Sequence, residues 1–142
     1  MEKPAYTEVF IRAMATAKSF DRGVGYWERR AVRRLERRGN IVMARVEGTS
    51  YPPYRVRVIL DRDGEVDEAG CNCPYDWGGW CKHIVAVLLV MLHEPERVKE
   101  RLSYEDLIDP LSEKELRALL RFLTERYPRL LTRIERWVDE EK

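Results

Sequence analysis

The sequence has few of the residues that disulfide or membrane stabilisation requires. Its three cysteines all lie between positions 71 and 81, and such clustering suits an intracellular metal site better than a disulfide framework. The longest apolar run, residues 84–92, is much shorter than the roughly 20 residues that cross a bilayer. Glu2 and Lys3 precede no apolar stretch typical of a secretory signal. We therefore expect a cytoplasmic protein with no membrane contact.

The sequence also lacks a strong excess of charge and the common catalytic motifs. The formal net charge is +1, which excludes a simple polycation, so any basic surface must be local. There is no glycine loop of the kind that cradles phosphates, and no His-x-Glu of the kind found in zinc deaminases. The chain has only two histidines that could act as bases. We expect a protein that is not an enzyme.

The middle of the chain carries the signals of a small sheet. Apolar and polar residues alternate, as in half-buried strands, and Asp63-Gly64 is a favourable hairpin turn. The predicted strands are residues 41–47, 54–60 and 65–69. They would form an antiparallel β-sheet whose last strand leads to the first cysteine.

Helical signals lie on both sides of this sheet. Thr7 is a candidate N-cap for a first helix that reaches about Lys18. Gly23 and Gly25 predict a loop over residues 20–26. The 142 residues suit one domain with a helical appendage. The predicted parts are an N-terminal helix at 1–22, a domain at 23–93 that holds the clustered cysteines, and a C-terminal helical extension at 94–142 that packs on the core.

The extension is expected to have a definite role in packing. A capping box that begins at Ser112 and a proline at position 128 predict two helices with leucine stripes. The helix at 82–92 is apolar all round and needs cover on two sides. We expect the second side to be covered, within one chain or across a homodimer, by Leu116, Leu120, Leu123, Ile134 and Trp137.

The strongest motif is a set of four potential zinc ligands. Cys71 and Cys73 form a Cys-x-Cys pair, and Cys81 and His83 follow as Cys-x-His after seven residues. Residues i and i+2 of an extended segment share a face, and the second pair can converge if His83 lies in the first turn of the apolar helix. Four protein ligands leave no open position for water, so we predict one structural zinc ion. His93 is interpreted as a helix-end histidine.

This pattern resembles the SWIM zinc finger, which has CxC, a variable spacer and CxH followed by an apolar helix. Two segments before Cys71 also match the usual strands of the family, an Ala-x-Val-x-Gly from Ala44 and a Tyr-x-Val from Tyr54. The resemblance covers about residues 23–92. It implies a nucleic-acid-binding or protein-interaction module like those of remodelling-type ATPases, transposases and recombination factors. The combined prediction is an α+β fold: a small antiparallel β-sheet with a CxCx7CxH zinc knuckle leading into a buried helix, plus an N-terminal helix and a C-terminal helical segment.

Arginines are the candidates for binding phosphate. Residues 28–38 carry a net charge of +4 and fit either a basic helix or a strand, and the resemblance favours a strand. The candidate contacts are Arg29, Arg30, Arg33, Arg34, Arg37 and Arg38 in this segment, and Arg55 and Arg57 on the strand at 54–60. The alternative is a solvated face with ion pairs to Glu28, Glu36 and Glu47. Trp77 and Trp80 either stack on bases or roof the zinc site.

We therefore expect a zinc-stabilised module that binds nucleic acid, DNA rather than RNA, through an arginine-rich face. The alternative is a protein–protein interaction adaptor for an ATPase or for a recombination or repair partner, which docks through the C-terminal helices. The chain would be a monomer or a homodimer.

Overall fold

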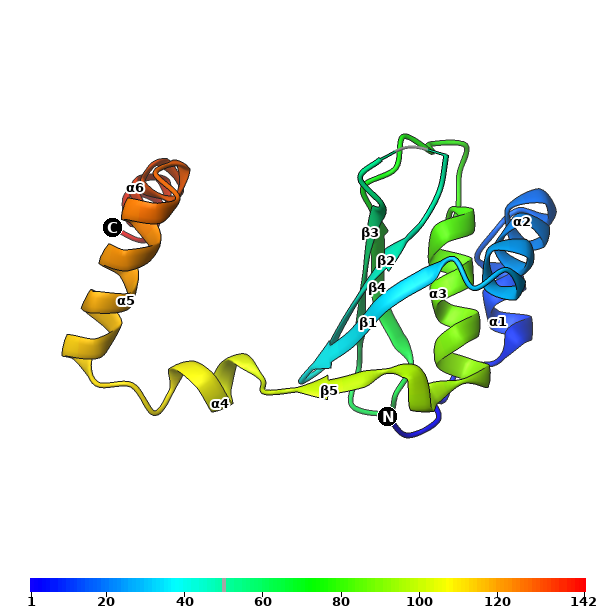
Figure 1. The fold of residues 1–142 in the computed structure, drawn as a ribbon, viewed down its shortest axis with the longest axis horizontal. Coiled ribbons are helices and arrows are strands. Elements are labelled where there is room, and N and C mark those ends of the chain that lie inside the picture. Colours follow the sequence, from blue (N-terminus) through cyan, green and yellow to red (C-terminus); the bar gives the residue numbers. More distant parts are fainter. Residues whose placement is uncertain (50) are drawn as a thin grey trace. The chain divides into compact units, whose positions relative to one another are not determined.

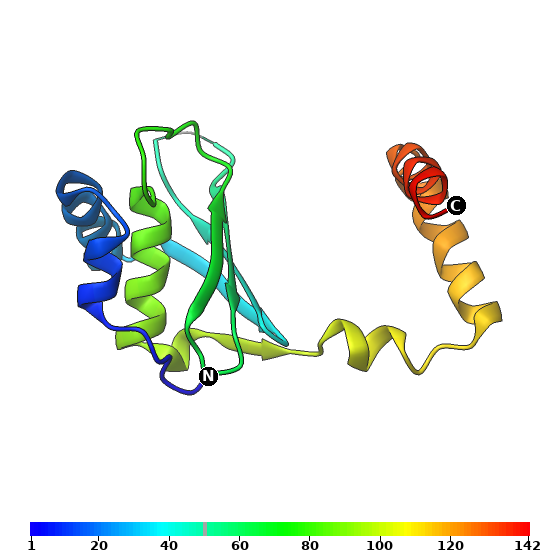
Figure 2. The same ribbon diagram turned by 180° about the vertical axis from the view of Figure 1, so that it is seen from behind.

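A five-stranded sheet with helices against one of its faces makes up the first part of the chain (Figures 1 and 2). The computed structural model describes residues 1–49 and 51–142, in two units, Met1–Leu102 and Ser103–Lys142. The strands of the first unit are β1 (Val32–Arg38), β2 (Ile41–Val46), β3 (Tyr54–Leu60), β4 (Val66–Cys71) and β5 (Lys99–Arg101). Its helices are α1 (Glu8–Ala13), α2 (Ala17–Glu28), α3 (Lys82–His93) and the short 3₁₀ helix η1 (Pro95–Arg97).

The sheet has the order β4-β3-β2-β1-β5, and its first four strands are antiparallel as predicted. The α+β class is confirmed, and so is the order of strand, knuckle and buried helix. The fifth strand was not predicted, and it makes the sheet mixed, because β5 pairs in parallel with β1. Its residues, Lys-Glu-Arg, are all exposed, so this edge strand carries no alternation of apolar and polar residues.

The N-terminal helical region is divided into two helices. Thr7 caps α1 as predicted, since its hydroxyl accepts a hydrogen bond from the Phe10 amide. The helix ends at Ala13, however, and not near Lys18. A second cap, Thr16, opens α2 directly afterwards.

Helix α2 runs straight through Gly23 and Gly25, so the predicted loop at 20–26 is wrong. Gly23 faces α3 at very close range: a Cβ at this position would lie 2.4 Å from Cγ1 of Val85. Glycine is needed at position 23 because the two helices approach so closely, and its helix-breaking tendency is overcome by this packing.

Helix α3 is the centre of the first unit. Every residue from His83 to Leu92 is buried, with the sheet on one side and α1 and α2 on the other (Figures 1 and 2). The need for cover on two sides is thus confirmed, but α1 and α2 supply the second cover. Our assignment of that role to the stripe Leu116, Leu120, Leu123, Ile134 and Trp137 is therefore wrong. The packing of the 94–142 extension on the core stays a prediction.

The second unit has little packing of its own. It consists of α4 (Tyr104–Ile108), α5 (Glu113–Arg126) and α6 (Arg129–Glu141), and no residue of the three helices is buried. The predicted capping box of α5 is present, and α4 begins with a second one at Ser103. Helices α5 and α6 meet at a corner and line an apolar hollow of about 560 Å³. Its apolar lining is Leu120, Leu123, Leu130, Ile134, Trp137 and Val138. None of the described helices combines the length and the hydrophobicity that a membrane span requires.

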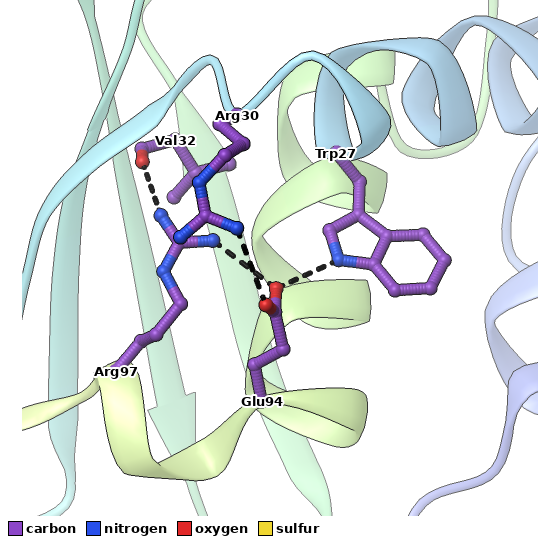
Figure 3. Close-up of polar contacts among 5 residues, drawn as sticks. All are labelled: Trp27, Arg30, Val32, Glu94 and Arg97. Carbon is purple, nitrogen blue, oxygen red and sulfur yellow. Dashed lines mark hydrogen bonds and ion pairs between the residues drawn. The ribbon is translucent and has the colours of Figure 1, made fainter.

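Glu94 connects three elements of the first unit at the C-terminal end of α3 (Figure 3). Its Oε2 accepts hydrogen bonds from Trp27 Nε1 at 2.9 Å and from Arg97 Nη1 at 3.1 Å. Its Oε1 lies 3.6 Å from Nη1 of Arg30, and Arg97 also donates to the Val32 carbonyl at 2.8 Å. The Trp27 hydrogen bond, followed by the hydrogen bond and charge of Arg97 and the charge of Arg30, lowers the pKa of the Glu94 carboxyl.

We expect Glu94→Gln to destabilise the first unit by about 1 kcal/mol at neutral pH, because it removes the charge between two guanidinium groups. Because the pKa is lower in the folded state, the Glu94 carboxylate stabilises the fold fully above its unfolded pKa of about 4.3. This stabilisation is lost as the pH falls through the folded-state pKa. The difference between wild type and variant should therefore disappear in acid. Urea unfolding across pH measures this, with Glu113→Gln as the control, since its pair with Arg117 is exposed. A difference that persists at low pH would contradict the role of the charge.

Candidate metal centre

The four predicted ligands come from the end of one strand and the start of one helix. Cys71 is the last residue of β4, and Cys73 follows in the connecting loop. Cys81 is the N-cap of α3, and His83 lies in its first turn, as the sequence predicted. The four ligand atoms all lie within 4.8 Å of one another.

The distances fit a closed tetrahedral site. Nδ1 of His83 lies 3.7 Å from Sγ of Cys71 and 3.8 Å from Sγ of Cys81. Zinc bonds of about 2.3 Å to sulfur and 2.0 Å to nitrogen would separate such atoms by about 3.5 Å in a tetrahedron. Three soft thiolates and one imidazole are also a donor set that zinc prefers. These residues therefore hold one structural zinc ion, which supplies a crosslink between the sheet and α3.

One of the three thiols, that of Cys81, is prepared for metal binding by its hydrogen bonds. A hydrogen bond from Cys71, with further ones from His83 and the Ile84 amide at the start of α3, lowers the pKa of Cys81 to about 4. The same bond between the two cysteines raises the pKa of Cys71, and burial raises that of Cys73. Cys81 is therefore the thiol that ionises first, at the N-terminus of the buried helix.

Two tyrosine rings hold the imidazole of His83. Tyr54 stacks on it with ring centroids 4.4 Å apart, and Tyr26 meets it edge-on at 5.2 Å. Nε2 of His83 is buried and has no hydrogen-bond partner among residues 1–49 and 51–142. Gly48 leaves room for this arrangement, since a Cβ there would lie 2.7 Å from Cε2 of Tyr54. The rings thus do the orienting that a carboxylate or carbonyl does for many metal-bound histidines.

The loop between the two ligand pairs is docked on the helical layer. Gly79, at φ 70°, lies against α1, and the Trp80 amide donates to the Met14 carbonyl at 2.9 Å. The Trp80 ring packs edge-on against Phe10, with centroids 5.7 Å apart, so it covers the apolar core beside the metal centre. Trp77, in contrast, is 83% exposed. Only Trp77 of the two candidate tryptophans is free to stack on a base.

The face of the sheet opposite α3 carries a row of arginines. Arg33 lies opposite Arg45, and Arg45 lies opposite Arg55, so three adjacent strands contribute one guanidinium each. Arg57 follows on the same face of β3. We call these four exposed residues, Arg33, Arg45, Arg55 and Arg57, the arginine row.

A bulge in β1 decides which of its arginines join this face. The register shifts between Arg33 and Glu36, with Arg34 at φ 49°, so that Leu35 becomes buried. Beyond the bulge Arg37 pairs with a buried valine on the α3 side. Its Nε donates to the Gly39 carbonyl at 2.6 Å. The bulge thus removes Arg37 from the outer face, and it turns Arg38 outward.

The remaining candidates lie elsewhere. Arg29 follows α2 and its guanidinium lies 3.9 Å from the centroid of the Tyr26 ring. Arg30 is engaged with Glu94 (Figure 3). Of the ion pairs weighed as the alternative, Arg33 has one with Glu47 at 3.6 Å, and Glu36 pairs with Arg101 at 3.2 Å.

Sequence reasoning missed three residues that complete these sites. Arg45 is central in the arginine row, and the alternation of β2 could have placed it outward with the neighbouring arginines. Tyr26 and Tyr54 flank the metal-binding histidine. Tyr54 belongs to the Tyr-x-Val motif, but its spacing in the sequence does not predict a contact with His83. That contact depends on how β3 pairs within the sheet.

A closed Cys₃His set between a strand and a buried helix defines a structural zinc finger. The particular kind is the SWIM zinc finger, whose family model matches residues 54–91. Residues 54–91 therefore carry a SWIM zinc finger, and the resemblance inferred from the sequence is confirmed. No solved structure matches the chain at a significant level.

One relative matches nearly the whole chain. It is a Drosophila melanogaster protein described as a zinc finger SWIM domain-containing protein 8 homolog, 28% identical over 130 residues. The match covers 90% of this chain but 6% of the relative. The similarity thus extends beyond the zinc finger itself, while the chain corresponds to a small part of the relative.

Proposed function

We propose that this protein is a zinc-stabilised module that binds nucleic acid, DNA rather than RNA, through the arginine row. The observation that carries the proposal is the direct opposition of Arg33, Arg45 and Arg55 on three neighbouring strands. Guanidinium groups bind phosphates in a bidentate manner, so a row of them offers several contacts to backbone phosphates.

The arginine row is unfavourable for the fold by itself. Like charges directly opposite each other on a sheet are destabilising. Arg45, Arg55 and Arg57 have no ion pair within the described part of the chain that would offset this repulsion. An anionic ligand would relieve the repulsion, which makes these positions better explained by binding than by stability.

The surroundings of Arg55 and Arg57 leave room for a phosphate. A hollow of about 260 Å³ lies beside both side chains, next to Gly70 and Asn72, with Glu68 also in its lining. Gly70 lies opposite Arg57 and contributes no side chain. Asn72 accepts a hydrogen bond from the Arg55 amide at 2.7 Å and directly follows the ligand Cys71. The zinc knuckle thus holds the backbone of one end of the arginine row.

We expect Arg45→Gln and Arg55→Gln to weaken DNA binding and to reduce the slope of log affinity against log salt by about one unit each. Fluorescence anisotropy with labelled duplex and single-stranded DNA, and RNA of the same sequence, measures both quantities. The matched control is Arg37→Gln, which removes an equal charge from the other face of the same sheet.

The fold should not suffer in these variants. Because Arg45→Gln removes like-charge repulsion, thermal stability should stay constant or rise, by about 0.2–1 kcal/mol. Loss of affinity without loss of stability would support the arginine row. An unchanged salt slope in the double variant, or an equal loss in Arg37→Gln, would refute it.

The second candidate function is a protein–protein interaction adaptor. The exposed apolar hollow between α5 and α6 favours it, because such surfaces on soluble proteins mark interaction sites. Under this alternative, substitutions in the hollow would abolish partner binding, and substitutions in the arginine row would leave it intact.

A further inference from the structure

Helices α5 and α6 carry the spacing of helices that pack against other helices. Apolar residues recur at alternating intervals of four and three along both helices and the corner between them, the a/d pattern of coiled coils. The residues are Leu116, Leu120, Leu123, Tyr127, Leu130, Ile134 and Trp137. None is buried, and Trp137 is 62% exposed.

The second unit cannot cover these residues alone. It has 40 residues, and domains of this size seldom fold without disulfides, metals or oligomerisation. Residues 103–142 contain no cysteine, and the four metal ligands all lie in the first unit. Burial of the apolar residues against a second copy of the chain would supply this stabilisation.

The charges of α6 are unevenly distributed along the helix. The first part of the helix, residues 129–136, has three arginines and one glutamate, whereas the last part, residues 137–142, has three acidic residues and one lysine. This is the reverse of what the helix macrodipole favours, since its first turn has no acidic residue and its last turn no basic residue. The charges therefore weaken the isolated helix.

The same distribution favours pairing with an antiparallel copy. When two α6 helices run in opposite directions, the basic half of each lies beside the acidic half of the other, and parallel pairing would bring like charges together. A two-fold axis would bring the apolar lining of both copies together, because such an interface uses the same patch on each subunit. We propose that the protein forms a homodimer through the α5–α6 hollow, with the two α6 helices antiparallel.

A charge-swap experiment on the full, zinc-loaded chain tests this proposal. Analytical ultracentrifugation of the wild type should give twice the chain mass of 16.9 kDa. The variant Arg129→Glu/Arg133→Glu and the variant Glu140→Arg/Glu141→Arg should each dimerise at least about 100-fold more weakly, because like charges then face one another. An equimolar mixture of the two variants should restore the dimer.

Failure to fold cannot imitate this result. Each double variant places charges that the helix macrodipole favours, so the helicity of α6 should be kept or increased. Trp137→Glu, inside the hollow, should also give monomers. Its matched control is Phe122→Glu on α5, which lies outside the hollow and is 64% exposed. A monomeric wild type, dimers that survive charge reversal, or a mixture that stays monomeric would each overturn the proposal.

Discussion

Cys81→Ser should abolish zinc binding and unfold the first unit near the knuckle, with a large fall in melting temperature. Cys81 is the most buried of the three thiols and the one whose pKa is lowered, so it anchors the metal to α3. Structural zinc contributes on the order of 10 kcal/mol to folding, which is comparable with the whole stability of a small domain. Few single side chains in the core could have a similar effect.

The substitution isolates the metal from the helix cap. Cys81 occupies the N-cap position of α3 without a side-chain capping bond, and serine is one of the best N-cap residues. Any loss of stability in Cys81→Ser therefore comes from the missing ligand. Elemental analysis should find one zinc per wild-type chain and none in the variant, and circular dichroism should follow unfolding with and without a chelator.

His93→Gln is the matched control for the metal centre. His93 lies at the opposite end of α3, stacked on Trp27 and 3.6 Å from Glu8, so this variant should keep its zinc. It is a helix-end residue and not a fifth ligand, and its partners are the side chains of Trp27 and Glu8. A wild-type protein that is fully folded and contains no zinc would contradict the structural role of the metal.

Gly23→Ala and Gly25→Ala should change stability in opposite directions, although the two glycines lie on the same helix. At Gly23 the new Cβ would meet Val85 at 2.4 Å and the Lys82 carbonyl at 3.0 Å, so α2 must shift away from α3. Overpacking of this kind costs about 1–3 kcal/mol. At Gly25 the nearest atom is the Arg29 guanidinium at 3.7 Å, and alanine should stabilise the helix by about 0.5–1 kcal/mol.

The effect at Gly23 should reach the metal centre. The Lys82 carbonyl belongs to the first turn of α3, between the ligands Cys81 and His83. Displacing this turn should weaken zinc affinity in Gly23→Ala and leave it unchanged in Gly25→Ala. Urea unfolding and competition with a zinc chelator measure the two quantities. Equal stability of both variants would show that α2 and α3 are not packed as described.

The zinc ligands were predictable because the information is local. Cys71 and Cys73 share a face of an extended segment. Cys81 and His83 lie at the start of a helix that the apolar run at 84–92 predicts. The same holds for the α5 capping box at Ser112. Short-range periodicity and caps decide all of these features.

The errors arose where contacts distant in the sequence decide the structure. Gly23 was interpreted as a loop residue because its close neighbour, Val85, lies far along the chain. The bulge at Arg34 reverses the face of Arg37 and Arg38, and strict alternation gives no sign of it. The second side of α3 is covered by α1 and α2. The first helix ends early, at Ala13, so the N-terminal region holds a second helix as well.

The complete burial of α3 has a consequence for hydrogen exchange. Amide protons of a helix enclosed on two sides become accessible to deuterium only when the whole first unit opens, so residues 86–92 should exchange most slowly and report its global free energy of unfolding. The amides of α5, whose side chains are all at least partly exposed, should exchange through local opening. Exchange rates would thus separate the two units of one chain without cutting it.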